Sequence, residues 1–143
     1  GMSAYDRILI PTDGSDEGVQ TSLNHALTLA QKFDSVLHVL YVSDSGENVG
    51  NSSRFMGEKS PAGKGATSRV EREAERYGVR TETEIAQGGP VEEIVQYSRK
   101  EAVNLIVMGT HGRTGISRVL EGSVTEKVIR KSKKPVLAVE RED

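Results

Sequence analysis

The feature that most constrains the fold is a regular alternation between short apolar segments and longer amphipathic ones. The segments at residues 5–11, 35–42, 104–108 and 135–139 each contain a short apolar run, such as Ile8-Leu9-Ile10 in the first, which is typical of strands buried on both faces of a parallel sheet. Residues 79–86 instead alternate threonine and apolar side chains with charged ones, which predicts an edge strand whose charges discourage intermolecular pairing. The sequence therefore predicts five strands.

Between these segments, apolar residues recur every three or four positions, as they do on one face of a helix. The spacing predicts helices over residues 16–33, 66–77, 90–102 and 123–132, with Pro90 at a first helical position. The resulting order, β-α-β-α-β-α-β-α-β, favours an α/β fold in which a doubly wound parallel sheet carries helices on both faces. We expect residues 1–143 to form a single domain, because this length is close to the commonest domain size.

Two segments fall outside this pattern. Residues 43–65 are rich in Ser, Gly and Asn and lack periodicity, so they are predicted to form a long flexible connection. Gly1, which precedes Met2, is interpreted as the remnant of a cleaved tag. His38 stands alone within a predicted buried strand and is interpreted as a core residue rather than a catalytic one.

Composition argues against several classes of function. The net charge of −2 gives no reason to expect binding to nucleic acid or to an anionic membrane. The chain has no cysteine, which excludes disulfides, thiolate metal sites and a cysteine nucleophile. No apolar run approaches the roughly 20 residues of a membrane span, and no signal peptide is visible. We therefore expect a cytoplasmic protein that does not act on membranes or nucleic acid.

Ligands of doubly wound sheets bind beyond the carboxyl ends of the strands, where the strand order reverses. Two loops have suitable chemistry. The first, Pro11-Thr12-Asp13, follows the first predicted strand and is dense in turn-forming residues. The second follows the fourth predicted strand and contains the spacing Gly109-x2-Gly112-x9-Gly122-Ser123. If the first and fourth strands are neighbours, both loops face one crevice.

The glycine spacing is suited to an anion. Glycines allow the backbone to approach phosphates without an intervening Cβ, and a helix N-terminus favours negative charge. Ser123 stands three residues before Glu126, a capping-box pattern that predicts a helix beginning at Ser123. The alternative is that the glycines only form turns and that Ser123 only caps the helix. The standard nucleotide loops, Gly-x-x-x-x-Gly-Lys-Ser/Thr and Gly-x-Gly-x-x-Gly, are absent from the sequence.

The Pro11-Thr12-Asp13 turn, the glycine spacing and the closing residues 134–139, Lys-Pro-Val-Leu-Ala-Val, together resemble the ATP-binding branch of the universal stress protein family. The resemblance extends from Tyr5 to Val139. It implies a Rossmann-like five-stranded sheet of order 3-2-1-4-5 with a nucleotide between strands 1 and 4. It also implies a homodimer that pairs through its last strands, which here run from Pro135 to Val139.

The resemblance assigns roles to individual residues. Asp13 would contact the ribose or a metal-linked phosphate, the backbone of Val42 would contact adenine, and Met108 and Gly109 would border the ribose. The phosphates would lie against the glycine loop and the start of the following helix. The full set implied is Pro11, Thr12, Asp13, Val42, Met108, Gly109, Gly112, Arg113, Gly122, Ser123 and Val124, with ATP and Mg²⁺ as cofactors and Asp13 as the metal ligand.

Some of these residues have simpler interpretations. Asp13 also fits an Asx-turn or a helix cap, and Arg113 also fits a solvated surface charge. Val42 would be buried in any case, so only its backbone is informative. His111 lies between two glycines of the motif, and its role is left open.

We consider three possible functions that belong to different classes. The favoured one is a regulatory module in which bound ATP sets a state that an unknown protein partner recognises. The second is a slow ATP hydrolase or phosphotransferase, and no catalytic residue is assigned because a second acidic residue is not evident near the loops. The third is a nucleotide-free scaffold that acts through its dimer surface.

Overall fold

The computed structural model describes residues 4–14, 16–43, 61–110 and 122–140. Its strands and helices follow the order predicted from the sequence. The elements are β1 Arg7–Thr12, α1 Asp16–Phe33, β2 Val36–Ser43, α2 Pro61–Tyr77, β3 Thr81–Gln87, α3 Pro90–Lys100, β4 Leu105–Gly109, α4 Gly122–Ser132 and β5 Val136–Val139.

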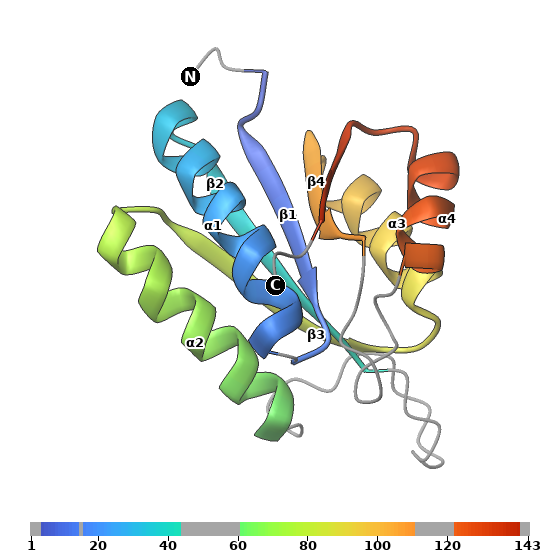
Figure 1. The fold of residues 1–143 in the computed structure, drawn as a ribbon, viewed down its shortest axis with the longest axis horizontal. Coiled ribbons are helices and arrows are strands. Elements are labelled where there is room, and N and C mark those ends of the chain that lie inside the picture. Colours follow the sequence, from blue (N-terminus) through green and yellow to red (C-terminus); the bar gives the residue numbers. More distant parts are fainter. Residues whose placement is uncertain (1–3, 15, 44–60, 111–121, 141–143) are drawn as a thin grey trace.

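The five strands form one parallel sheet in the order β3-β2-β1-β4-β5. The strand order therefore runs outward from β1 in one direction and outward from β4 in the other, so it reverses between these two strands (Figure 1). This confirms the predicted doubly wound sheet of order 3-2-1-4-5, and it confirms β3 as an edge strand.

The helices cover the two faces of the sheet in pairs, with α1 and α2 on one face and α3 and α4 on the other (Figure 1). Strand residues divide between the faces by alternation: Ile8 and Ile10 pack in the core beneath α1 and α2, whereas Leu9 packs in the core beneath α3 and α4. Residues of β1, β2 and β4 are almost all buried. This double burial explains their nearly continuous apolar sequences.

The expected flexible connection over residues 43–65 is wrong at both ends. Ser43 is the last residue of β2, and α2 begins at Pro61, five residues before the predicted start. Proline is accepted at a first helical position because no intrahelical bond is lost there. Gly63 is buried against Ile85, so packing compensates for the poor helix propensity of glycine. The remainder of the connection, residues 44–60, lies outside the described residues.

The start of α4 differs by one position from the capping-box prediction. The helix begins at Gly122, so Ser123 lies in its first turn and is not the capping residue that precedes it. The backbone is already helical at Gly122, one residue earlier than the side-chain pattern indicated. The predicted helix end at Ser132 is confirmed.

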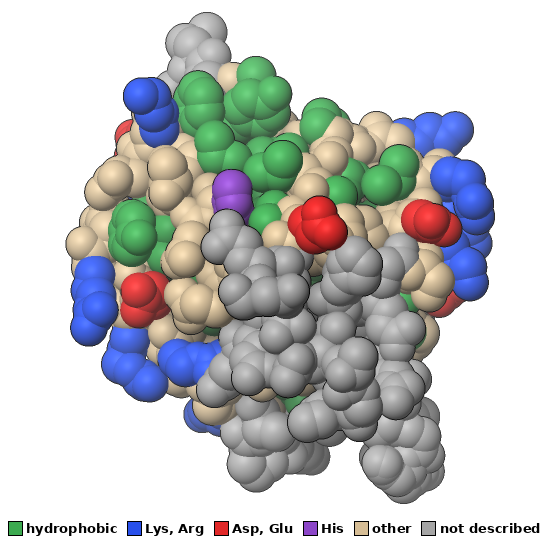
Figure 2. All heavy atoms as spheres, viewed as in Figure 1, with side chains coloured by type: hydrophobic (Ala, Val, Ile, Leu, Met, Phe, Trp, Pro, Cys, Tyr) green, Lys and Arg blue, Asp and Glu red, His purple; other side chains and the backbone are tan. Residues whose placement is uncertain are grey.

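The surface carries charge of both signs. Lys and Arg side chains lie on both flanks of the face in Figure 2, with acidic side chains between them, rather than along one continuous basic groove. Within the described ranges, no helix combines the length and the hydropathy needed to cross a bilayer.

Candidate functional site

The structure places nine of the eleven candidate residues at one edge of the sheet. Pro11 and Thr12 end β1 and Asp13 follows them; Val42 lies near the end of β2; Met108 and Gly109 end β4. The remaining three form the first turn of α4, namely Gly122, Ser123 and Val124. Gly112 and Arg113 lie outside the described residues, as does His111.

The pairing of β1 with β4 stops before either strand ends. It comprises Ile8 with Leu105 and Leu9 with Ile106, whereas β1 stays paired with β2 as far as Thr12. The ladder ends at Leu9 because the next β1 residue whose backbone faces β4 is Pro11, which has no N–H to donate. The end of the ladder lies where the strand order reverses, which is where ligands of this architecture bind.

Pro11 determines where the β1–β4 ladder ends. The Arg7 carbonyl accepts a hydrogen bond from the Asn104 N–H at 2.8 Å, so alternation along β1 turns the backbone groups of residue 11 toward the β4 side as well. A proline has no N–H to donate, and in the middle of a fully paired strand it would remove a ladder bond. Pro11 therefore ends the β1–β4 ladder, because it lacks the N–H that would continue it.

The backbone at the end of β2 turns an acceptor toward the same place. The Ser43 carbonyl accepts a hydrogen bond from the Gly88 N–H at 3.0 Å on the β3 side. Carbonyls alternate along a strand, so the carbonyl of Val42 faces the β1 side. The last pair on that side is Thr12 with Tyr41. The whole of Val42, backbone included, has no exposed area in this structure.

A tight turn follows β1. The Gly14 N–H donates to the Thr12 hydroxyl at 3.0 Å, and Gly14 has φ of +91°, a conformation that favours glycine. A Cβ on Gly14 would lie 3.2 Å from the Tyr41 ring, so the turn packs closely on the end of β2. Burial, and secondarily the negative charge of Asp13, raises the pKa of Tyr41. The Asp13 carboxylate therefore lies near the Tyr41 hydroxyl, at the edge where β1 and β2 end.

A hydrogen bond fixes the start of α4 against the end of β4. The buried Thr125 hydroxyl donates to the Gly109 carbonyl at 2.7 Å. The following peptide is also held, because the Thr110 N–H donates to the Val139 carbonyl at 3.0 Å. The Thr125 bond holds the N-terminal turn of α4 beside the carboxyl end of β4, and the Thr110 bond holds the residue after β4 against β5.

The first turn of α4 carries no acidic residue, and Ser123 within it is exposed. In α3, by contrast, Glu92 and Glu93 lie in the first turn and compensate the positive end of the helix dipole. The N-terminus of α4 thus keeps unopposed positive character within its own first turn. It is suited to an anion such as a phosphate.

The sequence analysis missed two residues of this edge, Tyr41 and Thr125. Tyr41 supports the turn after β1, and Thr125 anchors α4 to β4. Neither stands in a glycine or turn motif. Their roles arise from contacts between elements distant in sequence, so no local pattern indicates them.

A scan against protein-family models matches residues 4–140 to the universal stress protein family. The chain is 40% identical over 146 residues to universal stress protein MJ0531 of Methanocaldococcus jannaschii, a match that covers 99% of this chain and 85% of that protein.

Solved structures of similar proteins also match this chain. The structure of protein MJ0577 from the same archaeon covers 99% of both chains at 32% identity, with a TM-score of 0.77. A universal stress protein solved in complex with cAMP has a TM-score of 0.72 and covers 98% of this chain and 100% of its own. The latter is 24% identical, and its likeness concerns the fold.

The anchor of α4 can be tested by Thr125→Val, which keeps the shape of the side chain and removes the hydroxyl. Loss of the bond to the Gly109 carbonyl should lower the free energy of unfolding by about 1 kcal/mol, measured by urea denaturation. The matched control is Thr28→Val. The exposed Thr28 hydroxyl bonds to a carbonyl of its own helix, so this change should stay within about 0.5 kcal/mol. Equal effects of the two substitutions would contradict the anchoring role.

Proposed function

Because this chain belongs to the universal stress protein family, we propose that it binds ATP at the carboxyl edge of its sheet and acts as a nucleotide-dependent regulatory module in a stress response. The observation that carries the proposal is the anchored N-terminus of α4 beside the carboxyl end of β4, where the strand order reverses. A fold alone does not establish a ligand, so the proposal depends on this geometry.

In this proposal the phosphates lie at the N-terminus of α4. The first three residues of the helix, Gly122 to Val124, present backbone N–H groups that have no partner within the helix. Gly122 adds no Cβ to hinder approach, and the exposed Ser123 adds a hydroxyl donor. In this proposal Gly112 and Arg113 complete the phosphate contacts.

The base and the metal would lie on the β1 and β2 side. The Val42 carbonyl can accept a hydrogen bond from the exocyclic amine of adenine, which guanine lacks at that position. Met108 and Gly109 then border the ribose. Asp13 supplies a carboxylate of the kind that Mg²⁺ prefers, so we assign it to a metal-linked phosphate. The cAMP complex of the similar structure shows that the fold accommodates an adenine nucleotide in that protein.

ATP binding is tested by calorimetry and by thermal melting of the full chain with Mg²⁺. ATP at 100 times its Kd should stabilise the protein by about 2.7 kcal/mol, and GTP should stabilise it less. Gly122→Val should lower ATP affinity more than tenfold, because a branched side chain would stand where the phosphates approach.

The matched control is Gly65→Val, since Gly65 is also helical and a Cβ there meets no atom within 4 Å. Circular dichroism must show both variants folded, and the control should bind ATP within twofold of the parent. A folded Gly122→Val that binds as tightly as the parent would refute the phosphate assignment. If the parent does not bind at millimolar ATP and carries no nucleotide after purification, the scaffold alternative replaces the proposal.

We further propose that the protein is a homodimer that pairs through β5. This strand is at the sheet edge, and its Val136, Leu137 and Ala138 all retain exposed area. Ile129, on the preceding helix, is 46% exposed. An apolar edge strand is a liability unless another chain covers it. The opposite edge, β3, carries Glu82 and Glu84 and is protected by charge.

Leu137→Asp should convert a dimer to a monomer at tens of micromolar, measured by light scattering, because it places a charge within the paired strands. Ala138→Asp, at an exposed position, provides the same test if the first variant does not fold. Thr83→Asp on β3 is the matched control at the other edge and should leave the mass unchanged. A monomeric parent, or dissociation by Thr83→Asp alone, would contradict the assignment.

A further inference from the structure

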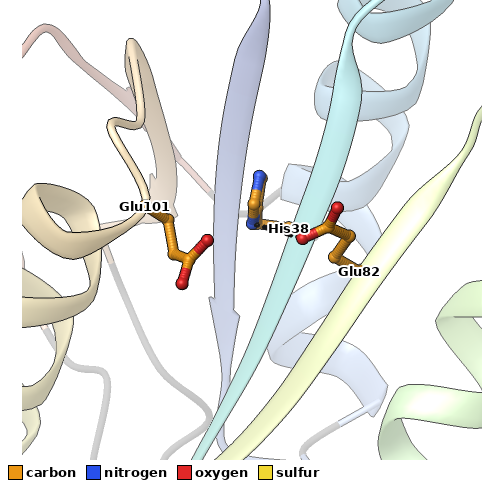
Figure 3. A group of neighbouring side chains, drawn as sticks. All are labelled: His38, Glu82 and Glu101. Atoms are coloured by element: carbon orange, nitrogen blue, oxygen red, sulfur yellow. Dashed lines mark ion pairs between the residues drawn. The ribbon is translucent and has the colours of Figure 1, made fainter.

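A second group of ionisable side chains lies away from the proposed nucleotide site. His38 of β2 stands between Glu82 of β3 and Glu101, which caps the end of α3, and the two carboxylates flank its ring from opposite sides in Figure 3. One ligand atom from each residue can be chosen so that all three lie within 4.8 Å of one another. We call these residues the His38 cluster.

The His38 cluster lies toward the opposite end of the strands from the proposed nucleotide site. His38 pairs with Leu9 on one side and with Glu82 on the other, three residues before the last pair, Thr12 with Tyr41. Three residues of strand span about 10 Å. The cluster therefore lies toward the amino ends of the strands, on the face covered by α3, and shares no residue with the nucleotide site.

The sequence-based interpretation of His38 as a core residue is confirmed by its burial, because none of the residue is exposed. Its Nδ1 is 2.8 Å from the Tyr97 hydroxyl and 4.0 Å from a Glu82 carboxylate oxygen. Its Nε2 is buried and has no hydrogen-bond partner among the described residues. A half-satisfied polar ring in a core costs stability relative to an aliphatic side chain. The unsatisfied atom is Nε2, whereas the atom nearest Glu82 is Nδ1, which already bonds to the Tyr97 hydroxyl.

The electrostatic setting keeps the imidazole neutral. Burial lowers the pKa of His38 below 6.5, the carboxylates of Glu82 and Glu101 oppose this, and the Arg7 guanidinium adds to the lowering. Burial also raises the pKa of Tyr97, so that side chain stays a neutral phenol. A neutral imidazole beside two carboxylates is a set of groups that binds transition metals.

We propose that the His38 cluster is a binding site for a divalent transition-metal ion such as Zn²⁺, with Nδ1 of His38 and one carboxylate oxygen each from Glu82 and Glu101 as protein ligands. A tetrahedral ion with bonds of 2.0–2.2 Å holds its ligands roughly 3.3–3.6 Å apart, so the groups must close by about 1 Å. Glutamate side chains can make this adjustment by changing rotamer. Water completes the coordination.

Access and charge both suit this assignment. The Glu82 side chain is 61% exposed on an edge strand, so an ion can reach its carboxylate from solvent. The His38 side chain is 1% exposed, so the ion reaches Nδ1 only when the Tyr97 hydroxyl moves aside. The two carboxylates carry two negative charges and Arg7, whose guanidinium donates to the Glu101 carbonyl at 3.0 Å, carries one positive charge. The net local charge of about −1 favours a dication. On loading, the Tyr97 hydroxyl gives up Nδ1 and becomes available to hydrogen-bond a ligating carboxylate.

The test uses the full chain, ¹⁵N-labelled and stripped of metal by a chelator, titrated with Zn²⁺ in the absence of nucleotide. The chain has three histidines, and imidazole ¹⁵N spectra distinguish them without any substitution. The ring signals of His38 should change first and saturate at one equivalent, and a hundredfold excess of Mg²⁺ should not reverse the change.

Two substitutions sharpen the result. Glu82→Gln should weaken Zn²⁺ binding at least tenfold. Glu84→Gln, which removes the same charge two residues further along the same strand, should stay within twofold. Spectral changes confined to His25 or His111, no change with Zn²⁺, or equal losses in the two variants would each overturn the proposal. The ATP experiments use neither Glu82 nor His38, so the two proposals can fail separately.

Discussion

The structure depends on how far two neighbouring strands stay paired. β1 and β4 lie side by side at the reversal of strand order, yet they pair only through Leu9 and Ile106. Beyond that point the hydrogen-bonded pairs of β1 are with β2 and extend to Thr12. The β1–β4 ladder ends there because Pro11, whose backbone faces β4, has no N–H to continue it. The reversal of strand order brings the carboxyl ends of both strands to one edge of the sheet.

The electrostatics of that edge follow from where α4 begins. Thr125 holds the start of α4 beside Gly109, and the first turn of α4 has no acidic residue to oppose its dipole. Asp13, which follows β1, brings a carboxylate to the same edge of the sheet. A ligand whose phosphates lie at α4 and share a metal ion with Asp13 would match these charges, which is the physical basis for proposing a nucleotide.

Much of the fold could be predicted from the sequence, because burial on both faces of β1, β2 and β4 forces continuous apolar runs and exposure of β3 forces alternation. The boundaries of the helices were less predictable. The first five residues of α2 include two glycines, and Gly63 is held there by packing against Ile85, which is distant in sequence.

The residues of the candidate site could likewise be predicted only in part from the sequence. Residues at strand ends, such as Thr12 and Gly109, could be located because the carboxyl ends of parallel strands meet at one edge. Thr125 and Tyr41 could not, because their roles depend on the distance between elements rather than on a local motif. The same holds for Glu101, which meets His38 only when α3 folds onto the sheet.

The central claim is that a nucleotide occupies the carboxyl edge between β1 and β4 with its phosphates at α4. The most direct measurement is a ¹⁵N-amide NMR titration of the parent chain with Mg²⁺–ATP. The account predicts that the largest shifts occur at Gly14, Gly109, Ser123 and Val124, with Ala102 and Asn104 at the amino end of β4 nearly unchanged. Saturable shifts that are largest at the amino ends of the strands, with the α4 amides unmoved, would contradict it.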